Sequence, residues 1–201
     1  MKEVLFAGTS CVILSAGSSA RMGTHKALLK FDYETTFIQK ITETYSLAGI
    51  DRIIVVVNAE LLQMIKSSNL VLPEKVLLTI NNKPELGRFY SLQTGIKHLK
   101  PASSCFFQNI DNPFTSETLL RELISYKNKA DVIIPAYQDR AGHPVLISPT
   151  VVQQINSGID YEVRIDEFLK QYTEKRIGVS DQRILININS QEEYLNAGFI
   201  V

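Results

Sequence analysis

Residues 11–30 read CVILSAGSSARMGTHKALLK, and this stretch is the strongest indication of how the whole chain folds. Residues 11–14 are apolar or small and few enough for one buried parallel strand. The small residues 15–20 that follow are typical of a flexible loop rather than of a core. Backbone N–H groups in such a loop can approach an anion closely, and Arg21 and Lys26 bring positive charge to it. The stretch therefore predicts a strand that leads into a loop for a triphosphate.

Two common phosphate-binding loops do not fit this stretch. A Walker loop needs Gly-x4-Gly-Lys-Ser/Thr, but the spacing from Gly17 to Gly23 is wrong and Thr24 stands where lysine is required. A dinucleotide loop needs Gly-x-Gly-x-x-Gly, and Ser19 replaces its second glycine. The loop therefore belongs to neither class.

The loop does fit the pattern Leu-x-Ala-Gly-x-Ser-x-Arg-Met-Gly-x-x-Lys-x-Leu-Leu, which begins at Leu14 and ends at Leu29. This resembles the signature loop of the MobA-like nucleotidyltransferases, the family that includes molybdenum cofactor guanylyl- and cytidylyltransferases. The alternative is an ordinary turn with two solvated cations. The resemblance implies catalytic roles for Arg21 and Lys26. The loop residues that it assigns to nucleotide binding are Leu14, Ser15, Ala16, Gly17, Ser18, Arg21, Met22, Gly23 and Lys26.

Composition excludes several classes of protein. The 201 residues, 45% hydrophobic and 21% charged, predict one globular domain over residues 1–201. Lys+Arg 21 balance Asp+Glu 21, so no general basic surface is expected for nucleic acid or an anionic membrane. The chain has no apolar run of membrane length and no full signal-peptide core, so we expect a cytoplasmic protein. Cys11 and Cys105 are expected to be buried free thiols.

Apolar runs and helical periods alternate along the chain. The pattern predicts strands at residues 11–14, 53–57, 76–80, 105–110 and 131–136, and helices at residues 36–48, 61–67, 90–99 and 118–128. Such alternation predicts an α/β fold in which helices cover a mainly parallel sheet. The resemblance implies a three-layer, Rossmann-like nucleotidyltransferase fold with helices on both faces of that sheet. The alternating residues 184–189 predict a last strand, and Ser190 with Glu193 predicts a capping box that starts a helix.

Candidate metal ligands follow two of these strands. Asp111 comes directly after an apolar strand, where ligands of open α/β sheets bind, and it resembles the family's Asp-x-Pro-hydrophobic element. A carboxylate there suits Mg²⁺, although Asp111 can instead form a turn before Pro113. The resemblance makes Asp111 catalytic as well. By the same resemblance Asn189 completes the Mg²⁺ site, with Asn187 as the alternative ligand; both asparagines could also simply end a strand.

The segment from Asn81 through Gly87 to Ser91 resembles the cytidylyl branch of the family, in which the serine lies near the base. Asn81 and Ser91 are therefore assigned to nucleotide binding, which favours CTP over GTP. The alternative for Ser91 is a hydroxyl in the first turn of a helix. Residues 88–90, Arg-Phe-Tyr, are bulkier than those that the family carries.

Two further segments concern the acceptor. Gly142, His143 and Pro144 resemble a Gly-His-Pro-Val-Leu-Phe element of the same branch. The imidazole could hydrogen-bond an acceptor phosphate or organise the loop. Arg164 resembles the last residue of the family's Asp-x-Gly-x-Arg, in which Glu162 replaces the glycine. These residues are assigned to acceptor binding.

The resemblance implies a Mg²⁺-dependent transfer of NMP, CMP rather than GMP, from an NTP to a phosphate-bearing acceptor such as molybdopterin, with release of pyrophosphate. The repulsion between the two anions is countered by Mg²⁺ together with Arg21 and Lys26. The side chains of Arg21 and Lys26 are expected to be solvent-accessible. The alternatives are a sugar-phosphate nucleotidyltransferase and a non-catalytic nucleotide-sensing module. The expected partners are CTP or GTP and a small-molecule acceptor, with no nucleic acid and no membrane, and the chain is expected to be a monomer or weak homo-oligomer.

Overall fold

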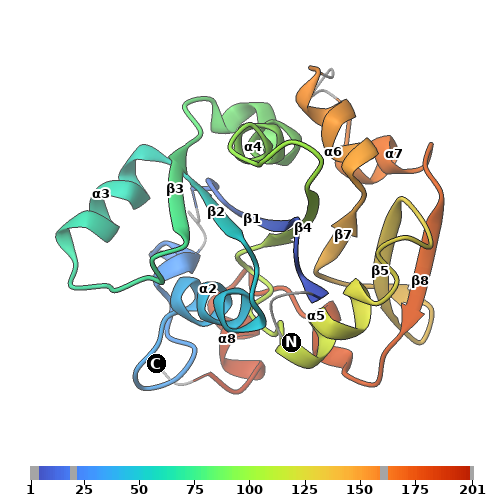
Figure 1. Cartoon of the computed structure of the whole chain (residues 1–201). Coiled ribbons are helices and arrows are strands. Elements are labelled where there is room, and N and C mark those ends of the chain that lie inside the picture. Colours follow the sequence, from blue (N-terminus) through green and yellow to red (C-terminus); the bar gives the residue numbers. More distant parts are fainter. Residues whose placement is uncertain (1–4, 19–21, 159–162, 200–201) are drawn as a thin grey trace.

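A mixed sheet runs through the middle of the computed structural model, which describes residues 5–18, 22–158 and 163–199 (Figure 1). The strands are β1 (Thr9–Ser15), β2 (Arg52–Val57), β3 (Val76–Ile80), β4 (Ser104–Asn109), β5 (Val132–Tyr137), β6 (Arg140–Ala141), β7 (Val145–Ile147) and β8 (Glu174–Gly178). Their order is β3-β2-β1-β4-β7-β5-β6, and β8 pairs with the other side of β5. Strands β3, β2, β1 and β4 run parallel to one another, whereas β7 is antiparallel to both of its neighbours, β4 and β5.

Helices cover both faces of this sheet (Figure 1). The α-helices are α2 (Phe37–Ala48), α3 (Ala59–Ser67), α4 (Gly87–Ile96), α5 (Glu117–Ile124), α6 (Pro149–Asn156), α7 (Ile165–Leu169) and α8 (Gln191–Asn196). Short 3-10 turns are η2 (Lys26–Leu28), η3 (Pro84–Leu86) and η4 (Gln182–Leu185). The three-layer α/β fold expected from the sequence is confirmed.

Strand β1 explains how the core divides into two parts. Its side chains are buried on both faces, and alternate residues enter different clusters. Cys11 and Ile13 pack with residues of α2, α3, α5 and α8, whereas Val12 and Leu14 pack with residues of α4, α6 and α7. Both cysteines are buried and free, as expected.

Helix α4 lies tightly on β1. A Cβ atom added at Gly95 would lie 2.5 Å from a side-chain carbon of Val12, so only glycine allows this approach. The helix runs over 87–96 rather than the expected 90–99, and its first turn, beginning at Gly87 with φ 81°, lies at the carboxyl end of the sheet. This packing places the first turn of α4 beside the loop after β1.

The expected strand over residues 184–189 is wrong. Residues 182–185 form η4, and 186–189 are assigned to neither helix nor strand. The backbone of this segment bonds to the turn after β4 instead of to a strand: Asn112 Nδ2 donates to the carbonyl oxygens of Ile184 and Ile186, and Ile188 N donates to Asp111 O. Alternation alone does not show where backbone hydrogen bonds will go.

The start of α8 is partly as expected. Ser190 is the N-cap, and its Oγ accepts from Glu193 N at 3.2 Å. Glu193 Oε2, however, accepts from Asn189 N at 2.6 Å rather than from Ser190 N. The carboxylate therefore fixes the backbone one residue earlier than a capping box would.

Within the described ranges, no helix is long and apolar enough to cross a membrane.

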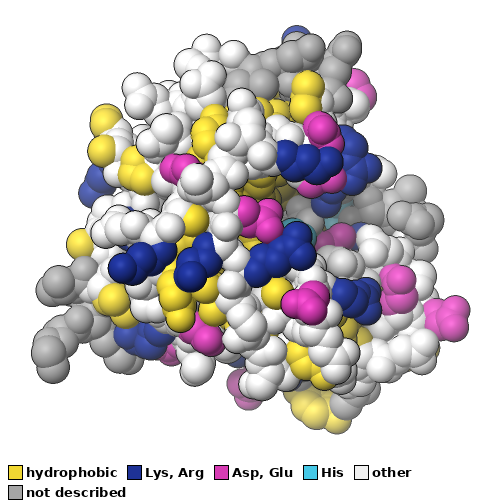
Figure 2. All heavy atoms as spheres, turned by 90° about the vertical axis from the view of Figure 1, so that its right-hand side faces the viewer, with side chains coloured by type: hydrophobic (Ala, Val, Ile, Leu, Met, Phe, Trp, Pro, Cys, Tyr) yellow, Lys and Arg dark blue, Asp and Glu magenta, His cyan; other side chains and the backbone are white. Residues whose placement is uncertain are grey.

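Figure 2 shows the side of the molecule that carries β8, where Lys and Arg side chains lie among Asp and Glu side chains. Arg176 Nε lies 2.7 Å from Glu174 Oε1, and Arg183 Nη2 lies 2.8 Å from Asp181 Oδ2. These contacts pair the charges of Arg176 and Arg183 with carboxylates.

Candidate functional site

A cavity of about 310 Å³ lies at the carboxyl ends of β1 and β4. These strands are parallel neighbours, so the loops that follow them emerge at the same edge of the sheet. The cavity is lined by residues 14–18, Met22, Lys26, Pro84, Gly87, Arg88, Ser91, residues 109–111 and Asn189. The loop after β1, the first turn of α4 and the turn after β4 therefore enclose one site.

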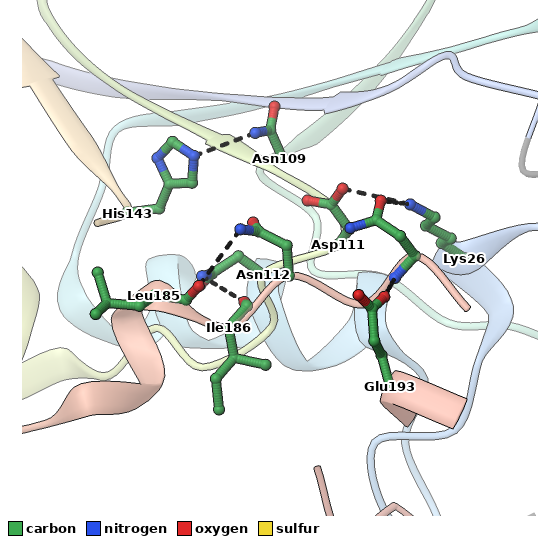
Figure 3. Close-up of polar contacts among 10 residues, drawn as sticks. Lys26, Asn109, Asp111, Asn112, His143, Leu185, Ile186 and Glu193 are labelled. Atoms are coloured by element: carbon green, nitrogen blue, oxygen red, sulfur yellow. Dashed lines mark hydrogen bonds and ion pairs between the residues drawn. The ribbon is translucent and has the colours of Figure 1, made fainter. Parts of the chain in front are cut away.

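Three predicted residues meet on one side of this cavity (Figure 3). Lys26 Nζ donates to Asn189 Oδ1 at 2.6 Å and to Asp111 Oδ2 at 3.3 Å. The Lys26 side chain is only 14% exposed and that of Asp111 20% exposed. The expectation of a solvent-accessible Lys26 is therefore wrong, because this lysine folds back onto the end of β4.

The donor set fits a hard divalent cation. Asp111 Oδ1 is buried and has no hydrogen-bond partner among the described residues. The lone pairs of this carboxylate oxygen are therefore available to a ligand in the cavity. Asp111 and Asn189 together offer oxygen ligands within reach of one ammonium group. The described ranges hold no group of three or more His, Cys, Asp or Glu side chains suited to a metal. The two oxygens of Asp111 and Asn189 fit a hard divalent cation that takes its other ligands from water and phosphate oxygens.

The loop residues fall largely where the sequence placed them. Residues 14–18, Met22 and Lys26 line the cavity, whereas Gly23 does not and instead adopts φ 69° in the loop. Arg21 lies outside the described residues.

Ser91 and Asn81 are brought together on the α4 side of the cavity. Ser91 lines the cavity, and buried Asn81 lies behind it, with its Nδ2 donating to Ser91 Oγ at 2.9 Å. Asn187 does not line the cavity and is exposed, with its Nδ2 donating to Leu185 O at 3.4 Å. Of the two asparagines, Asn189 is thus the one that lines the cavity and shares the Lys26 ammonium with Asp111.

The segment of Gly142, His143 and Pro144 does not line the cavity but lies behind it. His143 Nε2 lies 3.2 Å from Nδ2 of Asn109, which does line the cavity (Figure 3). A Cβ atom added at Gly142 would lie 2.7 Å from Ile184 O, so the segment packs against η4.

Arg164 lies at a second cavity of about 480 Å³. This cavity shares Gly87 and Arg88 with the first one. The Arg164 guanidinium pairs with Asp166 at 3.0 Å, and both side chains are well exposed. Arg164 is therefore next to the first cavity, not in it.

Sequence reasoning missed Asn109 and Arg88 as cavity residues. Asn109 could have been found from Asp111, because residues two apart on an extended chain share a face. Arg88 was noticed only as a bulky departure from the family pattern.

Burial lowers the pKa of His143; the nearby Arg88 lowers it further, and Asp111 partly offsets these effects. Nδ1 of the ring is buried without a hydrogen-bond partner among the described residues. The ring is therefore neutral near pH 7, with Nε2 free to accept from Asn109.

His143 should make the fold sensitive to mild acid. Because its pKa in the folded state is depressed, the unfolded chain binds a proton first, so stability falls as pH drops below about 6.5. Thermal unfolding of the wild type and of His143→Gln between pH 5 and 8 should show a smaller loss in the variant. The pKa values of Asp131 and Asp181 are lowered in the folded state, so protonation of these carboxylates reduces stability only near and below pH of about 4. Equal losses in both proteins between pH 5 and 6.5 would contradict this role.

Comparison with known proteins finds a family match and a curated relative. A family model described as MobA-like NTP transferase domain matches residues 11–176. The molybdenum cofactor cytidylyltransferase of Escherichia coli (strain K12) is 25% identical over 195 residues, which cover 93% of this chain and 94% of that protein.

Solved structures share the fold. Rv0371c from Mycobacterium tuberculosis H37Rv superposes with a TM-score of 0.78 at 20% identity, covering 94% of this chain and 97% of that one. Rv0371c has also been solved in complex with manganese, with a TM-score of 0.72 at 18% identity, covering 94% of this chain and 96% of that one. Molybdopterin-guanine dinucleotide biosynthesis protein A from Archaeoglobus fulgidus has a TM-score of 0.68 at 18% identity, covering 94% of this chain and 96% of that one.

Proposed function

Because the chain belongs to the MobA-like NTP transferase family and is a nucleotidyltransferase, we propose that it transfers CMP, in preference to GMP, from an NTP to a phosphate-bearing acceptor such as molybdopterin. Pyrophosphate is the other product. Residues 1–201 form one nucleotidyltransferase domain in this proposal. It acts in the cytoplasm as a monomer or weak homo-oligomer, without a nucleic-acid or membrane partner.

The observation that carries this proposal is the meeting of Lys26, Asp111 and Asn189 beside the loop after β1. Lys26 and Arg21 hold the triphosphate, together with the backbone and small side chains of residues 14–18 and of Met22 and Gly23. Asp111 and Asn189 hold Mg²⁺. When bound, this ion supplies positive charge that neutralises the phosphates and polarises them toward attack.

The reaction needs no covalent intermediate on the protein. An acceptor phosphate oxygen forms a bond to the α-phosphorus, and the bond from that phosphorus to the bridging oxygen breaks. Pyrophosphate leaves with the electron pair. The Lys26 ammonium reduces the repulsion between the two anions and stabilises the charge that gathers on the leaving oxygen, while the cavity walls orient both substrates.

The preference for CTP rests on Ser91 and on the cytidylyltransferase relative. The hydrogen bond from Asn81 fixes the Ser91 hydroxyl oxygen, which also lies 3.3 Å from Gly87 O. A fixed hydroxyl at the cavity wall can discriminate between the edges of two bases, because a mismatched base would leave a polar group unpaired.

The acceptor is proposed to enter through the second cavity, where Arg164 offers a guanidinium to its phosphate. Arg88 lines both cavities and so lies between the two substrates. Gly142, His143 and Pro144 contribute to acceptor binding from behind, through the contact of His143 with Asn109.

A thermal-shift screen of the four NTPs with Mg²⁺ tests the proposed nucleotide. A ligand that binds only the folded state stabilises it by about 2.7 kcal/mol at a hundred times its Kd. CTP is expected to raise Tm most. A larger shift with GTP would overturn the base preference.

Pyrophosphate release tests the reaction and the acceptor. We expect release from CTP with molybdopterin. Release only with sugar phosphates would support a sugar-phosphate nucleotidyltransferase, and nucleotide binding without release with any acceptor would support a nucleotide-sensing module.

A further inference from the structure

We propose that Asn112 is a positioning residue that holds Asn189 beside Asp111 and thereby sets the affinity of the site for a divalent cation. The inference rests on the proposed function, in which Asp111 and Asn189 hold that cation. Asn112 is 0% exposed and does not line the cavity. Any effect on the cavity must therefore pass through its neighbours.

The amide of Asn112 uses both of its hydrogens on the C-terminal segment (Figure 3). Nδ2 donates to Ile184 O at 2.9 Å and to Ile186 O at 2.8 Å. Both carbonyls lie just before Asn189, in a segment that has no strand partner of its own. The backbone adds a third bond, from Ile188 N to Asp111 O at 2.8 Å.

Asn112 is itself held by hydrogen bonds to the core. Gln108 Nε2 donates to Asn112 O, and Gln108 Oε1 accepts from Tyr45 Oη at 2.8 Å and from Thr115 Oγ1 at 2.7 Å. The side chains of Tyr45, Gln108 and Thr115 are all buried. The position of Asn112 is thus fixed by β4 and α2 and does not depend on the cavity.

The chemistry at position 112 explains why an asparagine is needed. Its Oδ1 is buried without a hydrogen-bond partner among the described residues, so the side chain contributes donors and not its acceptor. A side chain without N–H groups would leave the Ile186 carbonyl unpaired and the Ile184 carbonyl with only the His143 N–H, which lies 3.2 Å away, and would let the segment move. Asn189 is a neutral ligand, so its contribution to a cation depends on being held in place.

The test measures the dissociation constant of Mn²⁺, added alone, from the electron paramagnetic resonance of free Mn²⁺. Asn112→Ala is expected to raise this constant by about 10-fold, as loss of a group that orients a metal ligand does. Asn112→Leu, which fills more of the space but has no donor, should give the same loss and covers the case in which the alanine variant does not fold.

Thr115→Val is the matched control, because it removes one buried hydrogen bond to the same Gln108 without touching the C-terminal segment. It should leave the Mn²⁺ dissociation constant unchanged. In an Asn189→Ala background, Asn112→Ala should cause no further loss, since two residues that act through one ligand are not additive.

The outcomes separate this inference from the proposed function. Wild-type Mn²⁺ affinity in both Asn112 variants, or fully additive losses in the Asn189→Ala background, would overturn the inference alone. Wild-type protein that binds no Mn²⁺ would overturn the proposed metal site and the inference with it.

Discussion

Replacing Lys26 by methionine is expected to lower the turnover of NTP by about 10²- to 10³-fold, the usual cost of removing one group that stabilises transition-state charge. The methionine keeps most of the length and volume of the side chain but has no charge. Lys26 Nζ is 2.6 Å from Asn189 Oδ1 and 3.3 Å from Asp111 Oδ2, so the variant also leaves a carboxylate oxygen without its cation. We therefore expect a loss of stability of about 1–3 kcal/mol.

Lys30→Met is the matched control, since Lys30 is exposed and does not line the cavity. Turnover and NTP affinity should be unchanged in that variant. Steady-state kinetics and NTP titrations below the melting range of the Lys26 variant check the prediction. Wild-type NTP affinity in a protein carrying both Arg21→Ala and Lys26→Ala would remove the central hypothesis of a triphosphate loop.

The centre of the fold could be predicted from the sequence because its strands are buried on both faces. Short, continuous apolar runs such as those of β1 and β2 are typical of parallel strands that are covered on both faces. Helix α2 was equally clear, since its apolar period ends at Gly49, which adopts φ 94°.

The C-terminal segment could not be predicted in the same way. Residues 184–189 alternate like a strand, but their backbone groups bond to Asn112 and Asp111, which are far away in sequence. A side chain that takes the place of a neighbouring strand leaves no local signal. Tertiary contacts therefore decided this element.

In the candidate site too, residues with a local sequence signal were predicted, and residues placed by contacts distant in sequence were not. Asp111 and the loop after β1 were found because each directly follows an apolar strand. The burial of Lys26 was missed because it depends on Asn189, which arrives from the other end of the chain. Arg88 lines the cavity from the first turn of α4, a helix that Gly95 allows to lie close to β1.

Asp111→Asn is expected to reduce metal-dependent turnover by about 10²-fold or more, because it removes the only full negative charge that we assign to the cation. The side chain keeps its shape, and its remaining oxygen can still accept from Lys26, so the fold should be retained. The buried Oδ1 without a hydrogen-bond partner among the described residues is the atom that we expect the cation to use.

Two variants of Asn189 set the scale for this effect. Asn189→Ala removes a neutral ligand that water can replace, so its loss should be smaller, about 10-fold in metal affinity. Asn189→Asp supplies a second carboxylate within reach of Asp111 and should bind the cation more tightly than the wild type. Titration of NTP binding with Mg²⁺ in the three variants checks the order. An Asp111→Asn protein with an unaltered Mg²⁺ dependence would place the cation elsewhere and leave Asp111 only to shape the turn before Pro113.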